Sequence, residues 1–336
     1  MSSEIAAGNG YFFPEKGVFL ISVKKKLDSG LFWCYNTMKY FKNNEVLQMK
    51  GVFCFMQKKV LAIHDISCLG RCSLTAAIPI ISVSGAEVVP LPTAVLSTHT
   101  GGFSAFTFRD LTEDMRPIVN HWKKLGICFD VIYTGYLGSL EQVAIVKEII
   151  RDFSSSDTLV VVDPVMADAG QYYSMITPHF AVGMRELCEM ADIIMPNMTE
   201  AAFLLGEEYK EHYTAREIEV LLRKLALLGP KKIVLSGVSS DDFSQIGAAA
   251  YDVLSDTVSY ALAEKIDGFY HGTGDTFASA LIAALTRNKT IEEATRVAVE
   301  YTVTCIRRTH AEGTDTRYGV DIENEFPTLM RLLGMI

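Results

Sequence analysis

The chain has 336 residues, of which 49% are hydrophobic and 21% are charged, so length and composition predict a globular protein with two domains or one large α/β domain. The formal net charge of −9 argues against a nucleic-acid-binding surface, which would need a basic face. No apolar run in the sequence reaches the roughly 18 residues that a membrane span requires. We therefore expect neither nucleic acid nor membrane among its partners.

The first 59 residues differ from the rest in charge. They contain nine Lys, no Arg and four acidic residues, a net charge of +5, which leaves −14 for residues 60–336. MQKKVLAI, which begins at Met56, has the pattern of a first strand. We predict that residues 1–55 are an N-terminal extension without a catalytic role, for which a misassigned start site is one explanation, and that residues 56–336 form the catalytic domain.

Targeting and redox signals indicate a cytoplasmic protein. No positively charged start leads into an apolar core and a small-residue cleavage site, as a signal peptide would require. The seven cysteines are odd in number and include no CxxC spacing, so we interpret them as reduced thiols.

From residue 58 onward, β-rich runs alternate with segments of helical periodicity. The expected strands are 59–63, 86–91, 130–135, 158–164, 191–197 and 231–237, followed by a hairpin over 245–266. The expected helices are 73–84, which Pro79 should bend or break, 112–125, 140–153, a helix opening near Gly274 or Asp275, and a final helix over 291–308. This alternation predicts an α/β fold with a central, mostly parallel sheet that carries helices on both faces.

Several of these strands end in polar or glycine signals. DIS follows the first strand, TGY the third, DPVMAD the fourth, PNMTE the fifth and SG the sixth. Because the carboxyl ends of parallel strands lie at one edge of a sheet, where such folds bind ligands, we expect these signals to lie together.

The stretch HGTGD (271–275) precedes an apolar helical pattern. Glycines allow close backbone approach, and the free N–H groups of a helix N-terminus can bind an anion. Asp275 alone is explained equally well as a helix-terminal residue. The preceding glycines favour a second reading, in which the acid removes a proton from a hydroxyl while the amides hold a transferring phosphoryl group.

Two further motifs carry acids. Asp163 and Asp168 lie in VVVDPVMAD, and either could be a turn residue or could face magnesium and phosphate. In PNMTE, Asn197 and Glu200 have the spacing of a capping box, and the same oxygens could organise water around Mg²⁺.

GTGD, DPVMAD and PNMTE, in this chain order, resemble the motifs of the ribokinase-like superfamily. STHTGGF (97–103) and TGYLGS (134–139) resemble its vitamin-kinase branch and, within it, the pyridoxal/pyridoxamine kinases. The resemblance runs from residue 58 to residue 308, so residues 1–55 lie outside it.

The resemblance implies an ATP- and Mg²⁺-dependent phosphorylation of the 5′-hydroxymethyl group of pyridoxal, pyridoxamine or pyridoxine, the salvage of vitamin B6 to pyridoxal 5′-phosphate. Asp275 would be the general base, with Gly272, Thr273 and Gly274 as the anion hole. Asp163 and Glu200 would lie beside Mg²⁺. The ATP side would be formed by Asp168, Asn197, Ser236 and Gly237. Thr100 would bond to the pyridine ring and Tyr136 would cover it. The resemblance also implies a homodimer and leaves a monovalent cation open as a further cofactor.

Asp65 departs from the pattern, because many members of the family have Ser near this position. An acid there would suit a pyridinium nitrogen or an amine, or a different heterocycle such as hydroxymethylpyrimidine. The alternatives are therefore a hydroxymethylpyrimidine (phosphate) kinase, a sugar kinase of the same fold, or a non-catalytic vitamer-binding protein. For His64 and His99 a role as buried, satisfied polar residues is at least as plausible as a functional one.

Overall fold

The computed structural model describes residues 10–13, 18–26, 32–42, 45–49, 57–174 and 176–336. Contacts between residues divide the chain into two compact units, Met1–Gln57 and Lys58–Ile336. Of the extension predicted over 1–55, the described part forms an antiparallel sheet in the order β1-β2-β3-β4. Its strands are β1 (Gly10–Phe13), β2 (Val18–Lys26), β3 (Phe32–Lys42) and β4 (Glu45–Met49). Whether this unit lacks a catalytic role stays a prediction.

The second unit is built on a nine-stranded sheet in the order β15-β14-β13-β12-β9-β8-β5-β6-β7. Its strands are β5 (Lys59–Leu69), β6 (Glu87–Thr98), β7 (Phe108–Asp110), β8 (Val131–Thr134), β9 (Leu159–Val162), β12 (Ile193–Ile194), β13 (Lys232–Ser239), β14 (Gln245–Asp252) and β15 (Thr257–Glu264). The six strands from β13 to β6 pair in parallel, and β14, β15 and β7 add antiparallel edges. A separate pair, β10 (Ala167–Asp168) and β11 (Gln171–Tyr172), is antiparallel.

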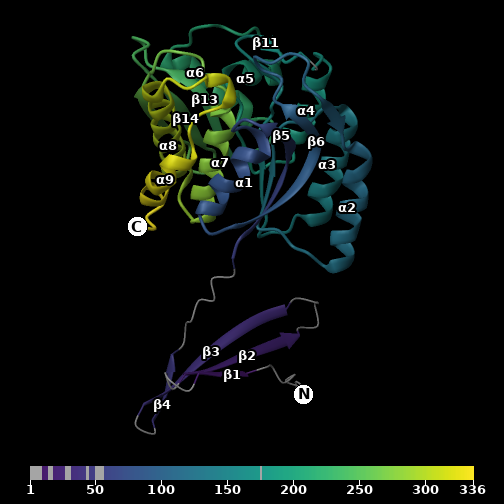
Figure 1. The fold of residues 1–336 in the computed structure, drawn as a ribbon, viewed down its shortest axis with the longest axis vertical. Helices are drawn as coiled ribbons and strands as arrows, with labels where there is room; N and C mark the ends of the chain where they lie inside the picture. The colour runs from purple at the N-terminus through teal and green to yellow at the C-terminus, as the bar shows by residue number, and fades with distance from the viewer. Residues whose placement is uncertain (1–9, 14–17, 27–31, 43–44, 50–56, 175) are drawn as a thin grey trace. The chain divides into compact units, whose positions relative to one another are not determined.

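Helices cover both faces of this sheet (Figure 1). One face carries α2 (Thr112–Leu125), α3 (Leu140–Phe153), α4 (Phe180–Cys188), α5 (Met198–Leu205) and α6 (Ala215–Ala226). The other carries α1 (Ser73–Val83), α7 (Thr273–Thr286), α8 (Ile291–Glu312) and α9 (Phe326–Leu332). The predicted α/β fold, with a mostly parallel sheet between two helical layers, is confirmed.

Alternating side chains of β5 show why the sheet needs both layers. Leu61 and Ile63 pack into the layer of α2 to α6, and Val60 and Ala62 pack into the layer of α1 and α7 to α9. All four are fully buried. A strand buried on both faces reads as a continuous apolar run, which is why this segment of the sequence predicted a parallel strand.

Several predicted element boundaries differ from the structure. The strands expected over 59–63 and 86–91 continue to Leu69 and Thr98, and the strand expected over 191–197 is only Ile193–Ile194. The helix expected over 73–84 is present as Ser73–Val83, and Pro79 lies inside it without breaking it. The helix expected to end at residue 308 continues to Glu312, where Gly313 caps it in the left-handed conformation, and α9 follows it.

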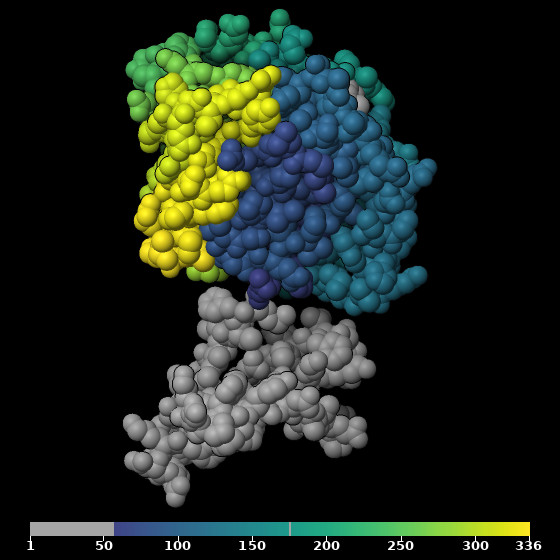
Figure 2. All heavy atoms as spheres, viewed as in Figure 1, coloured from purple at the N-terminus to yellow at the C-terminus, as the bar shows by residue number. Residues whose placement is uncertain are grey.

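The C-terminal segment of this unit lies beside the segments that follow β5 and β6. The Arg71 N–H donates to the Tyr318 carbonyl at 2.9 Å, and the His99 ring bonds to the Arg317 carbonyl. Figure 2 shows these yellow and blue segments sharing one face. In the part of the chain that the structure describes, no helix combines the length and the apolarity that crossing a membrane demands.

Both hydrophobic layers consist of residues between 60 and 333. We therefore expect a chain that begins at Met56 to fold and to show the same cooperative thermal unfolding, by circular dichroism, as the full chain. A chain that begins at His64 is the control, since it loses the first five residues of the central strand β5, four of them fully buried, and should not fold. A lower unfolding temperature for the Met56 chain would show that the α/β fold depends on the extension.

Candidate active site

The N-terminus of α7 carries unpaired backbone donors. Gly272 caps the helix with φ of +71°, and a Cβ at this position would overlap the Arg71 carbonyl oxygen. Glycine suits both the dihedral and the close approach. Among the described residues no acceptor is bonded to the N–H groups of Thr273, Gly274 or Asp275. Such donors at the positive end of a helix can bind an anion.

Space in front of these donors is open. A Cβ built on Gly274 meets no heavy atom within 4 Å, and Gly274 itself is exposed. The side of the helix start at Gly274 is therefore open, which suits the approach of an anion.

Asp275 is fixed at this helix end by bonds from another part of the chain. Its Oδ2 accepts the backbone N–H of Ser73 at 2.7 Å, and its Oδ1 lies 3.0 Å from Nε2 of His64. The Asp275 side chain is 18% exposed, so it retains access to solvent. Asp275 lies in the first turn of α7, where an acid suits the helix dipole, but its carboxylate bonds to His64 and Ser73 and to no N–H group of its own helix. The helix-terminal interpretation explains an acid here and leaves these two long-range bonds unexplained.

His64 lies between two carboxylates. Its Nδ1 is 2.8 Å from Oδ1 of Asp65, whose Oδ2 accepts the hydroxyl of Ser67 at 3.0 Å. His64 is 2% exposed. Burial disfavours the charged ring, but hydrogen bonds to Asp275 and Asp65 and their negative charges outweigh it and raise the pKa of His64 to about 10.

A glycine makes room for this ring. Gly135 follows β8, and a Cβ built on it would overlap His64. The N–H of Gly135 bonds to the Ile63 carbonyl, which holds the two segments at this separation. Position 135 therefore admits only glycine while the ring keeps its place.

Asp163 and Glu200 form a second acidic group at the ends of β9 and β12. Burial, followed by the charges of Glu200 and Asp275, raises the pKa of Asp163 well above its ordinary value. No hydrogen bond from a described residue reaches the Asp163 carboxylate. Burial also raises the pKa of Glu200, to about 8, although backbone N–H groups oppose the shift.

Asn197 and Glu200 make the capping box that their spacing predicted. The Asn197 Oδ1 accepts the Glu200 N–H, and the Glu200 Oε2 accepts the Asn197 N–H, both at 2.9 Å. The Glu200 Oε1 accepts the Met166 N–H at 2.9 Å, and the Asn197 amide donates to the Ala167 carbonyl. Both residues therefore tie the DPVMAD segment to α5, whatever else they bind.

The remaining residues expected on the nucleotide side occupy the same edge. Ser236 bridges to Asn197, and Gly237, with φ of +78°, lies at an irregularity in β13, which continues to Ser239 rather than ending there. Asp168 is exposed and accepts the N–H of Ala169.

Thr100 and Tyr136 lie on loops that follow β6 and β8. Beside Thr100, the His99 ring is 4.8 Å from the His271 ring, which adjoins the start of α7. The N–H of Tyr136 lies 3.3 Å from Nδ1 of His64, and burial raises the pKa of Tyr136 to about 12. The structure thus brings Asp65, Thr100, Tyr136 and Asp275 to one edge of the sheet.

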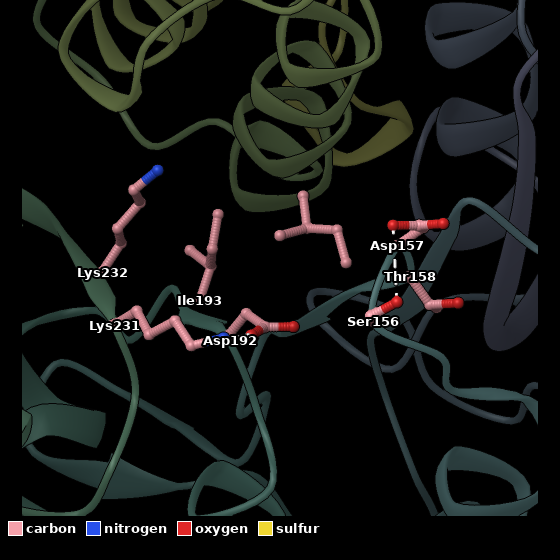
Figure 3. A pocket seen from close by; sticks show the side chains of 8 residues that line it. Ser156, Asp157, Thr158, Asp192, Ile193, Lys231 and Lys232 are labelled. Carbon is pink, nitrogen blue, oxygen red and sulfur yellow. Dashed lines mark hydrogen bonds and ion pairs between the residues drawn. The ribbon is translucent and has the colours of Figure 1, made fainter.

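A cavity of about 210 Å³ lies elsewhere (Figure 3). Ser156, Asp157, Asp192 and Lys231 line it at the amino ends of β9, β12 and β13. It is therefore at the opposite edge of the sheet from Asp275. Within this cavity the Lys231 ammonium group pairs with the Asp192 carboxylate at 2.7 Å.

Sequence reasoning missed three parts of this site. It gave His64 no partner, it did not single out Gly135, and it did not connect the Ser73 N–H to Asp275. Only the sequence separation of 211 residues between His64 and Asp275 is visible in the chain, and no local pattern predicts such a contact. Neither motif spacing nor hydrophobic periodicity carries information on this contact.

An α/β fold of this order, with an acid at an open helix N-terminus, defines a small-molecule kinase of the ribokinase-like class. Residues 118–319 match the family described as phosphomethylpyrimidine kinase. The chain belongs to this family and is a kinase. This confirms the family and enzyme class that GTGD, DPVMAD and PNMTE indicated.

Relatives include pyridoxal kinases. A protein of Schizosaccharomyces pombe assigned as a pyridoxal kinase is 30% identical over 240 residues, 68% of this chain and 73% of that protein. The crystal structure of pyridoxal kinase from Lactobacillus plantarum is 31% identical, with a TM-score of 0.76, and covers 82% of this chain and 98% of its own. A Bacteroides thetaiotaomicron structure with pyridoxal, assigned as a phosphomethylpyrimidine kinase, is 39% identical with a TM-score of 0.78, over 81% of this chain and 96% of its own.

Two glycine substitutions should have opposite outcomes. We expect Gly135→Ala to lower the free energy of unfolding by about 1–3 kcal/mol, because the new methyl group overlaps the buried His64 ring. Gly274→Ala is the control, since its methyl group would meet open space and alanine favours a helix. Denaturant unfolding measures both, and equal stability of the two variants would contradict the close approach at Gly135.

The buried Asp163 carboxylate should destabilise the ligand-free protein at high pH. Its pKa is raised in the folded state, so the folded protein holds this proton after the unfolded chain has released it, and stability falls as pH rises above about 3.8. We expect Asp163→Asn to raise the unfolding temperature at pH 8 and to raise it less at pH 5. Differential scanning calorimetry at both pH values checks this, and an Asp163→Asn variant that is less stable at pH 8 would contradict it.

Proposed function

We propose that this kinase transfers the γ-phosphoryl group of ATP to the 5′-hydroxymethyl group of pyridoxal and the related vitamers pyridoxamine and pyridoxine. The single observation that carries the proposal is the placement of Asp275, whose partly exposed carboxylate lies at a helix end with unpaired N–H groups. A base and an anion site at one point suit phosphoryl transfer to a hydroxyl.

In the proposed mechanism Asp275 accepts the proton of the substrate hydroxyl. Each of its oxygens already accepts one bond, from Ser73 or His64, and each retains a further lone pair. The N–H groups of Thr273 and Gly274 bind the phosphoryl oxygens on which negative charge gathers. Placing both groups in advance lowers the barrier through orientation and through preorganised electrostatics.

The acidic group at β9 suits a divalent cation. Among the described residues no three His, Cys, Asp or Glu side chains converge as a ready ligand set. Asp163 nevertheless offers a buried carboxylate whose pKa is raised by burial and by the negative charges of Glu200 and Asp275, and Mg²⁺ takes few protein ligands and keeps several waters. We propose that Asp163 and Glu200 lie on the Mg²⁺ side, where the bound ion would neutralise charge on the phosphates.

The residues assigned to the ATP side rest on the sequence motifs and on their place in the sheet. Asp168, Asn197, Ser236 and Gly237 are proposed to face ATP, because all four lie at the carboxyl edge of the sheet. A monovalent cation is a further candidate cofactor.

Thr100 and Tyr136 are proposed to bind the vitamer ring. The loop of Thr100 brings the His99 ring against His271, and the Tyr136 N–H lies beside His64. The similarity to a structure that contains pyridoxal supports this choice of substrate. Asp65, expected to bind a ring nitrogen or an amine, is buried and its two oxygens already accept bonds from His64 and Ser67, so a contact with substrate would have to use the further lone pair that each oxygen retains.

The second candidate is a hydroxymethylpyrimidine or phosphomethylpyrimidine kinase. The observation that favours it is the family match itself over residues 118–319. Both candidates use the same base and anion site, so only the acceptor distinguishes them.

We also propose a cytoplasmic homodimer. The cysteines of the second unit are free thiols, which suits a reducing compartment. The dimer rests on the resemblance of the sequence to pyridoxal kinases.

The test is a substrate panel with ATP and Mg²⁺, containing the three B6 vitamers, hydroxymethylpyrimidine and its phosphate. We expect the highest kcat/KM for a B6 vitamer, and Asp275→Asn should lower kcat by about 10²- to 10⁴-fold because the proton acceptor is lost. Product formation is measured by mass spectrometry and by the release of ADP.

Asp157→Asn is the matched control, since this exposed carboxylate lies at the opposite edge of the sheet and should leave kcat unchanged. Preference for the pyrimidine would support the second candidate. Near-normal turnover by Asp275→Asn would remove the base assignment.

A further inference from the structure

The mechanism above makes no use of His64, although this ring is the nearest ionisable group to the proposed base. Its Nε2 lies 3.0 Å from Oδ1 of Asp275 and its Nδ1 lies 2.8 Å from Oδ1 of Asp65. The three side chains therefore form a hydrogen-bonded series, Asp65–His64–Asp275, which runs from buried residues of β5 to the partly exposed base.

We propose that His64 is a positioning residue which, as an imidazolium ion held by Asp65, fixes the orientation of the Asp275 carboxylate for proton transfer. This inference rests on the proposed function of Asp275 and deepens it. His64 itself is buried and would act only through Asp275.

Two kinds of contact meet at the ring nitrogens. A carboxylate accepts hydrogen bonds only, so Nε2 carries a proton to bond to Asp275, and Nδ1 carries one when it bonds to Asp65. The backbone N–H groups of Asp65 and Tyr136 also lie 2.9 and 3.3 Å from Nδ1, and they could bond only to an unprotonated nitrogen. Burial favours the neutral ring, yet the two acids outweigh it and raise the pKa of His64 to about 10, so the charged ring is the form expected at neutral pH.

The ionisable groups around His64 favour a positive charge on its ring. Asp275 comes from α7 and Asp65 from β5 itself. After β9, the charge of His64 partly opposes the rise that burial causes in the pKa of Asp163. From β8, Tyr133 presents its ring at 6.4 Å. Among the described residues, no Lys or Arg forms a hydrogen bond or ion pair with Asp65 or Asp275, so His64 supplies the local positive charge.

The orientation of Asp275 is determined by two donors of different origin. His64 holds Oδ1 and the Ser73 N–H holds Oδ2, which leaves the carboxylate no free rotation about its final bond. Ser67 anchors Asp65 in turn, and glycine at position 135 provides the space for the ring.

The alternative is that His64 is a satisfied buried residue that matters for folding alone. Two conservative variants separate these explanations. Glutamine places its amide nitrogen near the position of Nε2, so His64→Gln can still donate to Asp275. Asparagine reaches only the position of Nδ1, so His64→Asn can donate to Asp65 and leaves Asp275 Oδ1 without its partner.

We expect His64→Asn to lower kcat by about 100-fold with little change in KM, because a misoriented base impairs the transition state and not substrate binding. His64→Gln should retain more activity than His64→Asn. In an Asp275→Asn background, neither substitution should lower kcat further, since the ring acts through the missing carboxylate. His121→Gln, on the exposed side of α2, is the control for histidine loss and should match the wild type.

Wild-type kcat in both His64 variants would overturn the proposal. An undiminished effect of His64→Asn in the Asp275→Asn background would overturn it as well, because the ring would then act by another route. Thermal unfolding of each variant accompanies the kinetics. If His64→Asn does not fold, His64→Gln and the spectroscopic measurement decide.

The spectroscopic measurement needs no turnover. In the full-length wild-type protein labelled with ¹⁵N-histidine, the His64 signals are identified by their absence from His64→Gln. We expect both ring nitrogens to be protonated at pH 8 and their shifts to change in Asp275→Asn. A neutral ring at pH 8, or shifts that Asp275→Asn leaves unchanged, would overturn the proposal. If no substrate of the panel is phosphorylated, the proposed function fails, and this measurement still decides whether His64 is the charged partner of Asp275.

Discussion

The hydrogen bond from the Ser73 N–H to Asp275 joins segments that lie 202 residues apart, and the site depends on it. Ser73 opens α1 directly after β5, and Asp275 belongs to the first turn of α7. The close approach of Gly272 to the Arg71 carbonyl keeps the same two segments together. Because α1 and α7 also pack against each other within one hydrophobic layer, the core fixes the position from which the carboxylate and the helix N–H groups face a ligand.

Several acidic side chains are buried at the carboxyl edge of the sheet, where they suit ligand binding and lower the stability of the ligand-free fold. Asp65, Asp163 and Glu200 are buried, and Asp275 is partly so. Of these, Asp65 and Asp275 share the His64 ring, Glu200 is held by backbone N–H groups, and Asp163 has no such partner among the described residues. Perturbed acids of this kind cluster at functional sites, and the least compensated one is where a cation would have the largest effect.

Several features of the fold followed directly from the sequence. The boundaries of α2 and α3 were predicted to the residue, and the Asn197–Glu200 capping box was recognised from its spacing. These features are local, because a cap or a helical period involves residues three or four positions apart. The helix over 73–84 was predicted as well, but the sequence left open whether Pro79 would bend or break it, because that depends on the packing of the flanking residues.

The sequence by itself determined the class of fold, the family and the identity of the acid at the helix start, because alternating strands and helices and ordered motifs are properties of the linear chain. Only the tertiary structure decided what surrounds that acid. His64 and Asp65 are adjacent in sequence and could equally have been buried, unrelated polar residues. The parallel pairing of β5 with β8 and the packing of α7 beside α1 bring the ring against Asp275, and contacts over such separations depend on the assembled core rather than on local pattern.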